Sequence, residues 1–178
     1  KLASIHGRYY AMDRDKNNNR VDVSYRVLTD LDGISFNDYH DYFKSQYQAR
    51  VEKNLDASDE FLIPAFNENV KATIKDNDSI IFANFRPDRA IQISTIFTNP
   101  TFYEVPAKNA DGSNKYAPYV PSKPVSNICF VCMMKYADSV KGEIAFKLDE
   151  LTNILGEYLA SNNHTQLRIA ETEKYAHV

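Results

Sequence analysis

The chain has few of the residues that common catalytic and ligand-binding motifs require. Only five glycines occur among its 178 residues, and no Gly-rich phosphate-binding loop is found. No G-x-S-x-G stretch is present to set a serine nucleophile on a sharp turn. No Asp and His cluster has the spacing typical of a metal site. Any ligand must therefore be bound by side chains that belong to none of these motifs.

Long apolar runs are also missing, and none approaches the length of a transmembrane helix. Residues 1–4 lack a signal-peptide apolar core and an initiator Met, which indicates a fragment. Cys129 and Cys132, the only cysteines, lie in an apolar run that predicts a strand, where residues three apart face opposite sides. We therefore predict that both cysteines pack in the core and bind no zinc, and that the protein is cytoplasmic.

Charge of neither sign dominates, since the formal net charge is −3. This balance argues against a nucleic-acid partner bound by bulk electrostatics. An anionic ligand would instead need a local cluster of cations. The hydrophobic fraction of 43% suffices for a packed core, and the length fits one domain, or one domain plus part of a second.

Apolar spacing predicts an alternation of strands and helices. Val21, Tyr25 and Leu28 recur at helical spacing, and Asn37 is expected to cap a helix that runs to about Lys53. Other helices are predicted over residues 90–97 and from about 147 to 160, and strands over residues 2–5, 79–85, 125–134 and 166–170. Apolar runs such as 79–85 are typical of parallel strands buried on both faces. The order predicts an α/β fold with a mostly parallel sheet flanked by helices.

Proline marks two exceptions to this alternation. Pro64 makes residues 61–66 an edge strand or an extended connection, because proline cannot donate to a strand ladder. Residues 99–124 hold five prolines, which predict a long surface loop. No function follows from the composition of this loop.

The first candidate site is Arg86-Pro87-Asp88-Arg89, which follows a predicted strand and precedes a predicted helix. Ligands of open α/β sheets gather beyond the carboxyl ends of the strands. Arginine binds phosphate and carboxylate in a bidentate manner, so Arg86 and Arg89 are candidates for an anion clamp. The alternative is that both arginines form salt bridges with Asp88 and neighbouring acids.

Two further basic segments are candidates. Arg8 and Arg14 bracket a short segment and could reach one anion, although Asp13 and Asp15 could equally balance Arg14. After the last predicted strand, Lys174 could neutralise a phosphate, and His177 could act in acid–base chemistry. A lone histidine near a chain end is more often a bystander.

Three stretches resemble signature motifs of the 2,3-bisphosphoglycerate-independent phosphoglycerate mutases. They are residues 7–15 (GRYYAMDRD), 84–90 (NFRPDRA) and 167–178 (LRIAETEKYAHV). They occur in the family's order, and the resemblance extends over essentially the whole chain. Two departures are the run Asn17–Asn19, which replaces a commonly basic and aromatic stretch, and a loop 99–124 that is longer than usual.

The resemblance implies a glycolytic isomerase that interconverts 3-phosphoglycerate and 2-phosphoglycerate through a phosphoserine intermediate. Such an enzyme uses two divalent ions, manganese or magnesium, and no 2,3-bisphosphoglycerate. Residues 1–146 would form most of its substrate-binding domain, 147–150 a hinge, and 151–178 part of an α/β metal domain. The serine and the metal ligands would lie outside this chain, so we expect the fragment alone to be inactive.

Carried over residue by residue, Arg8, Arg14, Arg86 and Arg89 resemble the family's substrate-binding arginines. Lys174 resembles the lysine that reaches the phosphate and assists catalysis. The resemblance implies a monomer whose partner is the small acid substrate, with no membrane partner. The four guanidinium groups should then meet around one small acid and not pair separately with neighbouring Asp or Glu residues. The alternative is a non-catalytic module that binds a small phosphorylated ligand.

Overall fold

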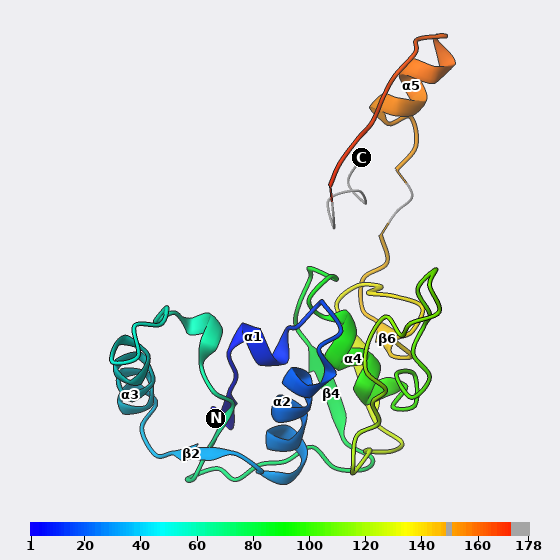
Figure 1. Ribbon diagram of the computed structural model, residues 1–178. Coiled ribbons are helices and arrows are strands. Elements are labelled where there is room, and N and C mark those ends of the chain that lie inside the picture. Colours follow the sequence, from blue (N-terminus) through cyan, green and yellow to red (C-terminus); the bar gives the residue numbers. More distant parts are fainter. Residues whose placement is uncertain (149–150, 172–178) are drawn as a thin grey trace. The chain divides into compact units, whose positions relative to one another are not determined.

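The computed structural model describes residues 1–148 and 151–171, which fall into two compact units (Figure 1). The first unit spans Lys1–Lys147, and the second begins at Leu148. Every strand of the described residues belongs to the first unit, which also carries all four arginines of the predicted site. Of the described helices, none is long and apolar enough to cross a membrane.

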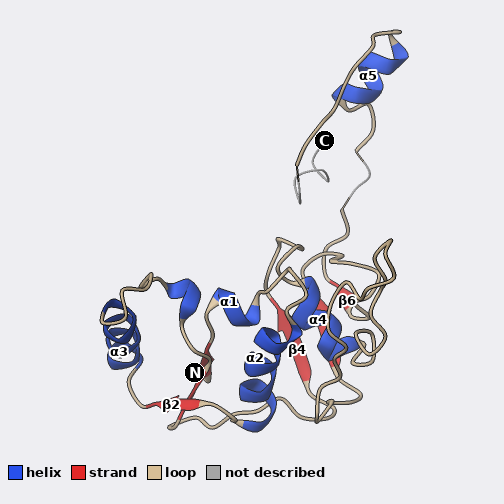
Figure 2. Ribbon diagram, viewed as in Figure 1, coloured by secondary structure: helices blue, strands red, loops and turns tan. Residues whose placement is uncertain are grey.

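Two small sheets organise the first unit (Figure 2). One has the order β1-β3-β2, built from β1 (Ser4–Ile5), β3 (Ala65–Asn67) and β2 (Ile34–Phe36). The other has the order β4-β5-β6, built from β4 (Ser79–Phe82), β5 (Cys129–Cys132) and β6 (Glu143–Ile144). Only the β1–β3 pairing is antiparallel among the described strands. The predicted α/β class with mostly parallel strands is confirmed.

Helices of the first unit cover these sheets. They are α1 (Arg8–Ala11), α2 (Asn18–Asp30), α3 (Tyr39–Val51), the 3-10 helix η1 (Asp59–Phe61) and α4 (Ile91–Thr98). The predicted spacing in α2 is confirmed, because Val21 and Tyr25 are buried and Leu28 packs against the same core. The helix predicted over residues 90–97 is found as α4, in which Ile96 is buried.

Buried apolar side chains form two separate groups. The larger core joins α2, α4 and the β4-β5-β6 sheet, and it comprises Val21, Tyr25, Ala90, Ile93, Ile96, Phe97, Tyr103, Phe130, Cys132 and Tyr136. The smaller core lies between the β1-β3-β2 sheet and α3, and it comprises Phe36, Tyr42, Leu62 and Ala65. Burial of apolar area is the main favourable contribution to folding, so the larger core is the main stabilising element.

Several predictions about strands were wrong, because the local sequence does not determine which strands pair. The strand after Pro64 is central, not an edge, since Pro64 precedes β3 and costs no ladder hydrogen bond. Conversely, β4 is an edge strand with Ile81 71% exposed, so it is not buried on both faces. Cys129 and Cys132 do face opposite ways, as predicted, but only Cys132 is buried.

The starts of two helices also differ from the prediction. The cap of α3 is Asp38, not Asn37, because the Asp38 carboxylate accepts hydrogen bonds from the first backbone N–H groups of the helix. In the second unit, α5 spans Leu155–Ser161 and begins later than expected, with Leu151 and Leu155 exposed. Residues 166–170 form no strand; Gln166 instead donates a hydrogen bond to the carbonyl of Gly156 in α5 (2.7 Å).

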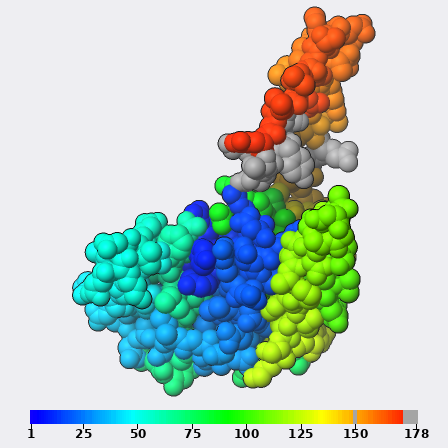
Figure 3. Space-filling model, viewed as in Figure 1, coloured from blue at the N-terminus to red at the C-terminus, as the bar shows by residue number. Residues whose placement is uncertain are grey.

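Residues 99–124 run over the surface of the first unit, as Figure 3 shows in green to yellow. The segment contains only an isolated bridge between Lys108 and Asn114 and no helix or strand, as predicted for a loop. Its end is tied to α2: the Tyr119 hydroxyl donates to Asp22 (2.7 Å), and the Tyr25 hydroxyl donates to the carbonyl of Lys123 (3.1 Å).

Candidate anion-binding site

Arg8 begins α1 immediately after a glycine that no other residue could replace without movement. The Gly7 N–H donates to the carbonyl of Leu62 (3.0 Å), and a Cβ on Gly7 would lie 2.5 Å from the carbonyl oxygens of Glu60 and Leu62. This close approach fixes α1 against residues 60–62. The guanidinium of Arg8 consequently forms an ion pair with the carboxylate of Glu60, and both side chains are partly exposed.

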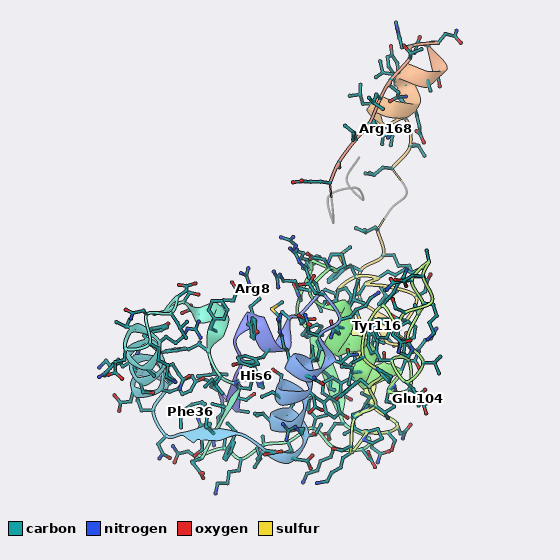
Figure 4. The ribbon with its side chains drawn as sticks, in the orientation of Figure 1. His6, Arg8, Phe36, Glu104, Tyr116 and Arg168 are labelled. Atoms are coloured by element: carbon teal, nitrogen blue, oxygen red, sulfur yellow. The ribbon has the colours of Figure 1, made fainter. Side chains whose placement is uncertain are left out.

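An open groove of about 760 Å³ lies beside this ion pair. Its lining combines three charged side chains with apolar and polar ones: Ile5, His6, Arg8, Met12, Phe43, Ser58, Asp59, Glu60 and Leu62. Figure 4 labels Arg8 and His6, which leave the same N-terminal segment. The His6 Nε2 is 2.8 Å from the Ser4 hydroxyl, and burial lowers the pKa of His6 to about 4. The groove therefore combines one arginine and two acidic side chains with an imidazole that is neutral at pH 7.

The arginines of the second motif follow β4 and meet the turn after α1. Arg86 holds the Asp88 carboxylate with two hydrogen bonds, Nε to Oδ1 (2.7 Å) and Nη2 to Oδ2 (3.0 Å). Arg14 donates from Nη1 to Oδ2 of the same carboxylate (3.0 Å). Arg89 donates from Nη1 to the backbone carbonyl of Met12 (3.0 Å). Arg14 and Arg89 thus link two segments that are more than 70 positions apart in the sequence, and Arg86 binds the carboxylate that Arg14 reaches.

The electrostatics of Asp88 follow from this arrangement. Burial opposes the charged form of its carboxylate, but hydrogen bonds from Arg86 and Arg14 outweigh burial, so the pKa of Asp88 is lowered from 3.8. The carboxylate is therefore ionised at neutral pH. Two guanidinium groups from distant motifs thus converge on one carboxylate of the chain itself.

Within the described residues the four guanidinium groups do not converge on one group, and a shared acidic ligand stays a prediction. Arg14 and Arg86 converge on Asp88, whereas Arg89 is committed to the backbone of Met12, and Arg8 forms its ion pair with Glu60. The alternative of salt bridges to local acids therefore holds for Arg86 with Asp88. Lys174 and His177 lie outside the described residues.

Sequence reasoning missed Glu60 and the role of Asp13. The Glu60 partner is 52 residues from Arg8, so no local pattern could reveal it. Asp13 was noted only as a charge near Arg14, yet it is buried and accepts hydrogen bonds across the whole turn that follows. Its position inside a signature motif was the available signal.

The run Asn17–Asn19 at the start of α2 is built into the fold. Asn18 is buried; it accepts a hydrogen bond from Gln92 (2.9 Å) and donates to the carbonyl of Ala117 (3.3 Å). The two departures from the family pattern are therefore in contact, since Ala117 belongs to the long loop. This contact gives the loop a structural role at the entry to α2.

Metal ligation finds no support in this part of the protein. Across residues 1–148 and 151–171, no three His, Cys, Asp or Glu side chains are placed to hold a metal ion. Ions implied by the family resemblance would need ligands from elsewhere, so no chemical step is assigned to a metal here.

The fold and site together define an α/β unit in which Arg14 and Arg86 of two motifs meet at one carboxylate and Arg8 lines an open groove. A family model described as BPG-independent PGAM N-terminus matches residues 1–138. The chain belongs to this family of 2,3-bisphosphoglycerate-independent phosphoglycerate mutases.

Individual relatives agree with this assignment. The chain is 47% identical over 182 residues to the 2,3-bisphosphoglycerate-independent phosphoglycerate mutase of Mesoplasma florum, covering 100% of this chain and 32% of the relative. It is 41% identical over 181 residues to the Listeria welshimeri protein of the same name, again covering 100% and 32%. The chain therefore spans about a third of the length of these relatives.

A solved structure agrees in fold. A phosphoglycerate mutase of Leishmania mexicana, crystallised at low cobalt concentration, superposes with a TM-score of 0.60 over 92% of this chain and 28% of that one. The sequences share 22% identity, so this likeness concerns the fold alone.

Proposed function

We propose that this chain supplies the substrate-binding arginines of a phosphoglycerate mutase that interconverts 3-phosphoglycerate and 2-phosphoglycerate. The observation that carries the proposal is the convergence of Arg14 and Arg86 on one carboxylate. Both arginines come from stretches that resemble family motifs. The substrate carries a carboxylate and a phosphate, which are the groups that arginine forks bind best.

In the intact protein, the phosphoryl group would pass from the 3-oxygen of the substrate to a serine and then to the 2-oxygen. The glycerate must stay bound and re-orient between these two transfers. The task of Arg8, Arg14, Arg86 and Arg89 is to hold its carboxylate and hydroxyl groups and to keep competing water away. Lys174 would reach the phosphate and stabilise its charge.

The rest of the proposal concerns the whole enzyme. Its serine and two manganese or magnesium ions would come from outside this chain, and it would need no 2,3-bisphosphoglycerate. Residues 1–146 would act as the substrate-binding domain, and 147–150 as a hinge by which it closes on a metal domain that includes 151–178. The first compact unit ends at Lys147, within this proposed hinge. We place the enzyme in the cytoplasm as a monomer.

Titration calorimetry of the 178-residue chain with 3-phosphoglycerate tests the site. We expect weak binding, because much of the pocket lies outside the chain. Arg86→Ala and Arg14→Ala should each weaken it about 10-fold or more, since a hydrogen bond to a charged group contributes roughly 1.5–3 kcal/mol. The control is Arg26→Ala, which removes an arginine paired with Asp22 and Asp32 on α2. Equal effects of all three substitutions would contradict the proposal.

Activity measurements test whether this chain needs the rest of the enzyme for catalysis. We expect no mutase turnover from this chain alone, even with added manganese, because the serine would lie outside it. Turnover by the isolated chain would overturn this assignment. A full-length gene without a serine and a His/Asp metal set around this segment would instead favour the non-catalytic binding module.

A further inference from the structure

Asp13 is a buried carboxylate with a set of donors built around it. It is 3% exposed. Its Oδ2 accepts from the backbone N–H groups of Asp15 (3.1 Å) and Asn17 (2.8 Å). Its Oδ1 accepts from the side-chain amide of Asn17 (3.1 Å) and from Nη1 of Arg20 (3.3 Å). A buried acceptor with several donors fixes the local backbone, because removing it would leave those donors unpaired.

The residues on either side of Asp13 make both links to the arginine motif after β4. Met12 provides the carbonyl that accepts from Arg89, and Arg14 donates to Asp88. Asp13 lies between these links, and its carboxylate holds the backbone that follows directly, at Asp15 and Asn17. A change in this turn would therefore displace the guanidinium of Arg14 and the acceptor of Arg89 together.

A second connection runs from Asp13 to α1. Arg20, which donates to Asp13, lies over the ring of Tyr9 at 4.1 Å from its centroid. Tyr9 follows Arg8 directly, so the Asp13–Arg20–Tyr9 chain joins the start of α2 to α1. One carboxylate is thus connected to both segments that present Arg8 and Arg14.

We propose that Asp13 is a positioning residue that orients Arg14, and through Arg20 and Tyr9 also Arg8, toward one acidic ligand. This inference rests on the proposed function for the identity of the ligand. Asp13 itself is buried and acts only through the arginines. It differs from a purely structural carboxylate because its removal should change ligand affinity specifically through Arg14.

The first experiment measures 3-phosphoglycerate affinity of the 178-residue chain by calorimetry. Asp13→Asn keeps the shape but turns a donor toward existing donors, and we expect it to weaken binding about 10-fold. Asp15→Asn, which removes the same charge from an exposed neighbour, should change affinity less than about 2-fold. Wild-type affinity in a folded Asp13→Asn variant would overturn the inference.

A double-mutant cycle separates positioning from general stability. In the Arg14→Ala background, Asp13→Asn should weaken binding by less than about 3-fold, because its effect acts through the missing guanidinium. Independent, multiplicative effects would contradict the inference. If Asp13→Asn fails to fold, Arg20→Lys provides the milder test, with an expected weakening of about 3-fold from loss of the Tyr9 stack. An unchanged affinity in Arg20→Lys would then refute the connection to α1.

A spectroscopic measurement works even without ligand binding. Side-chain N–H signals of Arg14 and Arg89 in ¹⁵N NMR spectra, assigned with Arg→Lys variants, should shift or broaden in Asp13→Asn and stay unchanged in Asp15→Asn. Unchanged signals in both variants would sink the inference. If wild-type chain binds no 3-phosphoglycerate but the signals respond as expected, the proposed function fails and the positioning role of Asp13 stands.

Discussion

The two cores of the first unit support the candidate arginines in different ways. Arg14, Arg86 and Arg89 lie beside the larger core, where one shared carboxylate and one backbone carbonyl hold them. Arg8 lies beside the smaller core and is held by the partly exposed Glu60. Exposed ion pairs contribute little to stability. The side chains of Arg8 and Arg86 are 49% and 69% exposed, whereas that of Arg14 is 26% exposed. We infer that the fold presets Arg14 and Arg89, whereas Arg8 and Arg86 can exchange their partners for a ligand at little cost.

The largest expected effect comes from breaking the cores themselves. Ile96→Ala in the larger core should lower the free energy of unfolding by about 3–5 kcal/mol, and Leu62→Ala in the smaller core by about 2–3 kcal/mol. Both residues are buried, but the larger core surrounds its side chains with more packed neighbours. Urea unfolding at a fixed pH measures the difference. A greater loss for Leu62→Ala would reverse the ranking of the two cores.

An intermediate effect concerns pH at the smaller core. The folded-state pKa of His6 is lowered to about 4 from 6.5, so the unfolded chain binds the proton more readily. The contribution of neutral His6 to the free energy of unfolding is therefore fully present above about pH 6.5, and it is lost as pH decreases toward 4. The contribution of His6 lost between about pH 7 and about pH 5 should be about 2 kcal/mol.

The matched variant is His6→Gln, whose side-chain amide can still reach the Ser4 hydroxyl. Its free energy of unfolding should depend less on pH over this range than that of the wild-type chain. Superimposable pH profiles for the two proteins would show that His6 does not titrate as described.

The smallest effects sharpen the comparison between the two ion-pair sites. Asp88→Asn, which weakens two arginine contacts, should cost about 1–2 kcal/mol of folding free energy. Glu60→Gln should cost less than about 1 kcal/mol, because the Arg8–Glu60 pair is exposed. Thermal or urea unfolding of both variants measures the difference. Equal losses would mean that Arg8 is held as firmly as the other arginines.

Sequence patterns predicted elements well where periodicity was strong and local. The burial of Val21 and Tyr25 followed from helical spacing, and the opposite faces of Cys129 and Cys132 followed from strand geometry. The helix cap shifted by one residue to Asp38 because neighbouring Asn and Asp side chains can both act as caps.

Strand position could not be predicted in the same way. Whether β4 is an edge and β3 is central depends on which strands pair across long sequence separations. The residues of a single strand do not identify the strands with which it pairs. The late start of α5 has a similar origin, because an exposed apolar stripe gains nothing from helix formation until another surface covers it.

By itself, the sequence determined the family, the α/β class and the identity of the candidate arginines, because these depend on motifs and local spacing. Only the tertiary structure decided which carboxylate each arginine meets, since Asp88 and Glu60 pair with Arg14 and Arg8 across 74 and 52 residues. It also revealed Asp13 as the centre of the turn, because burial and convergent donors are properties of the folded chain.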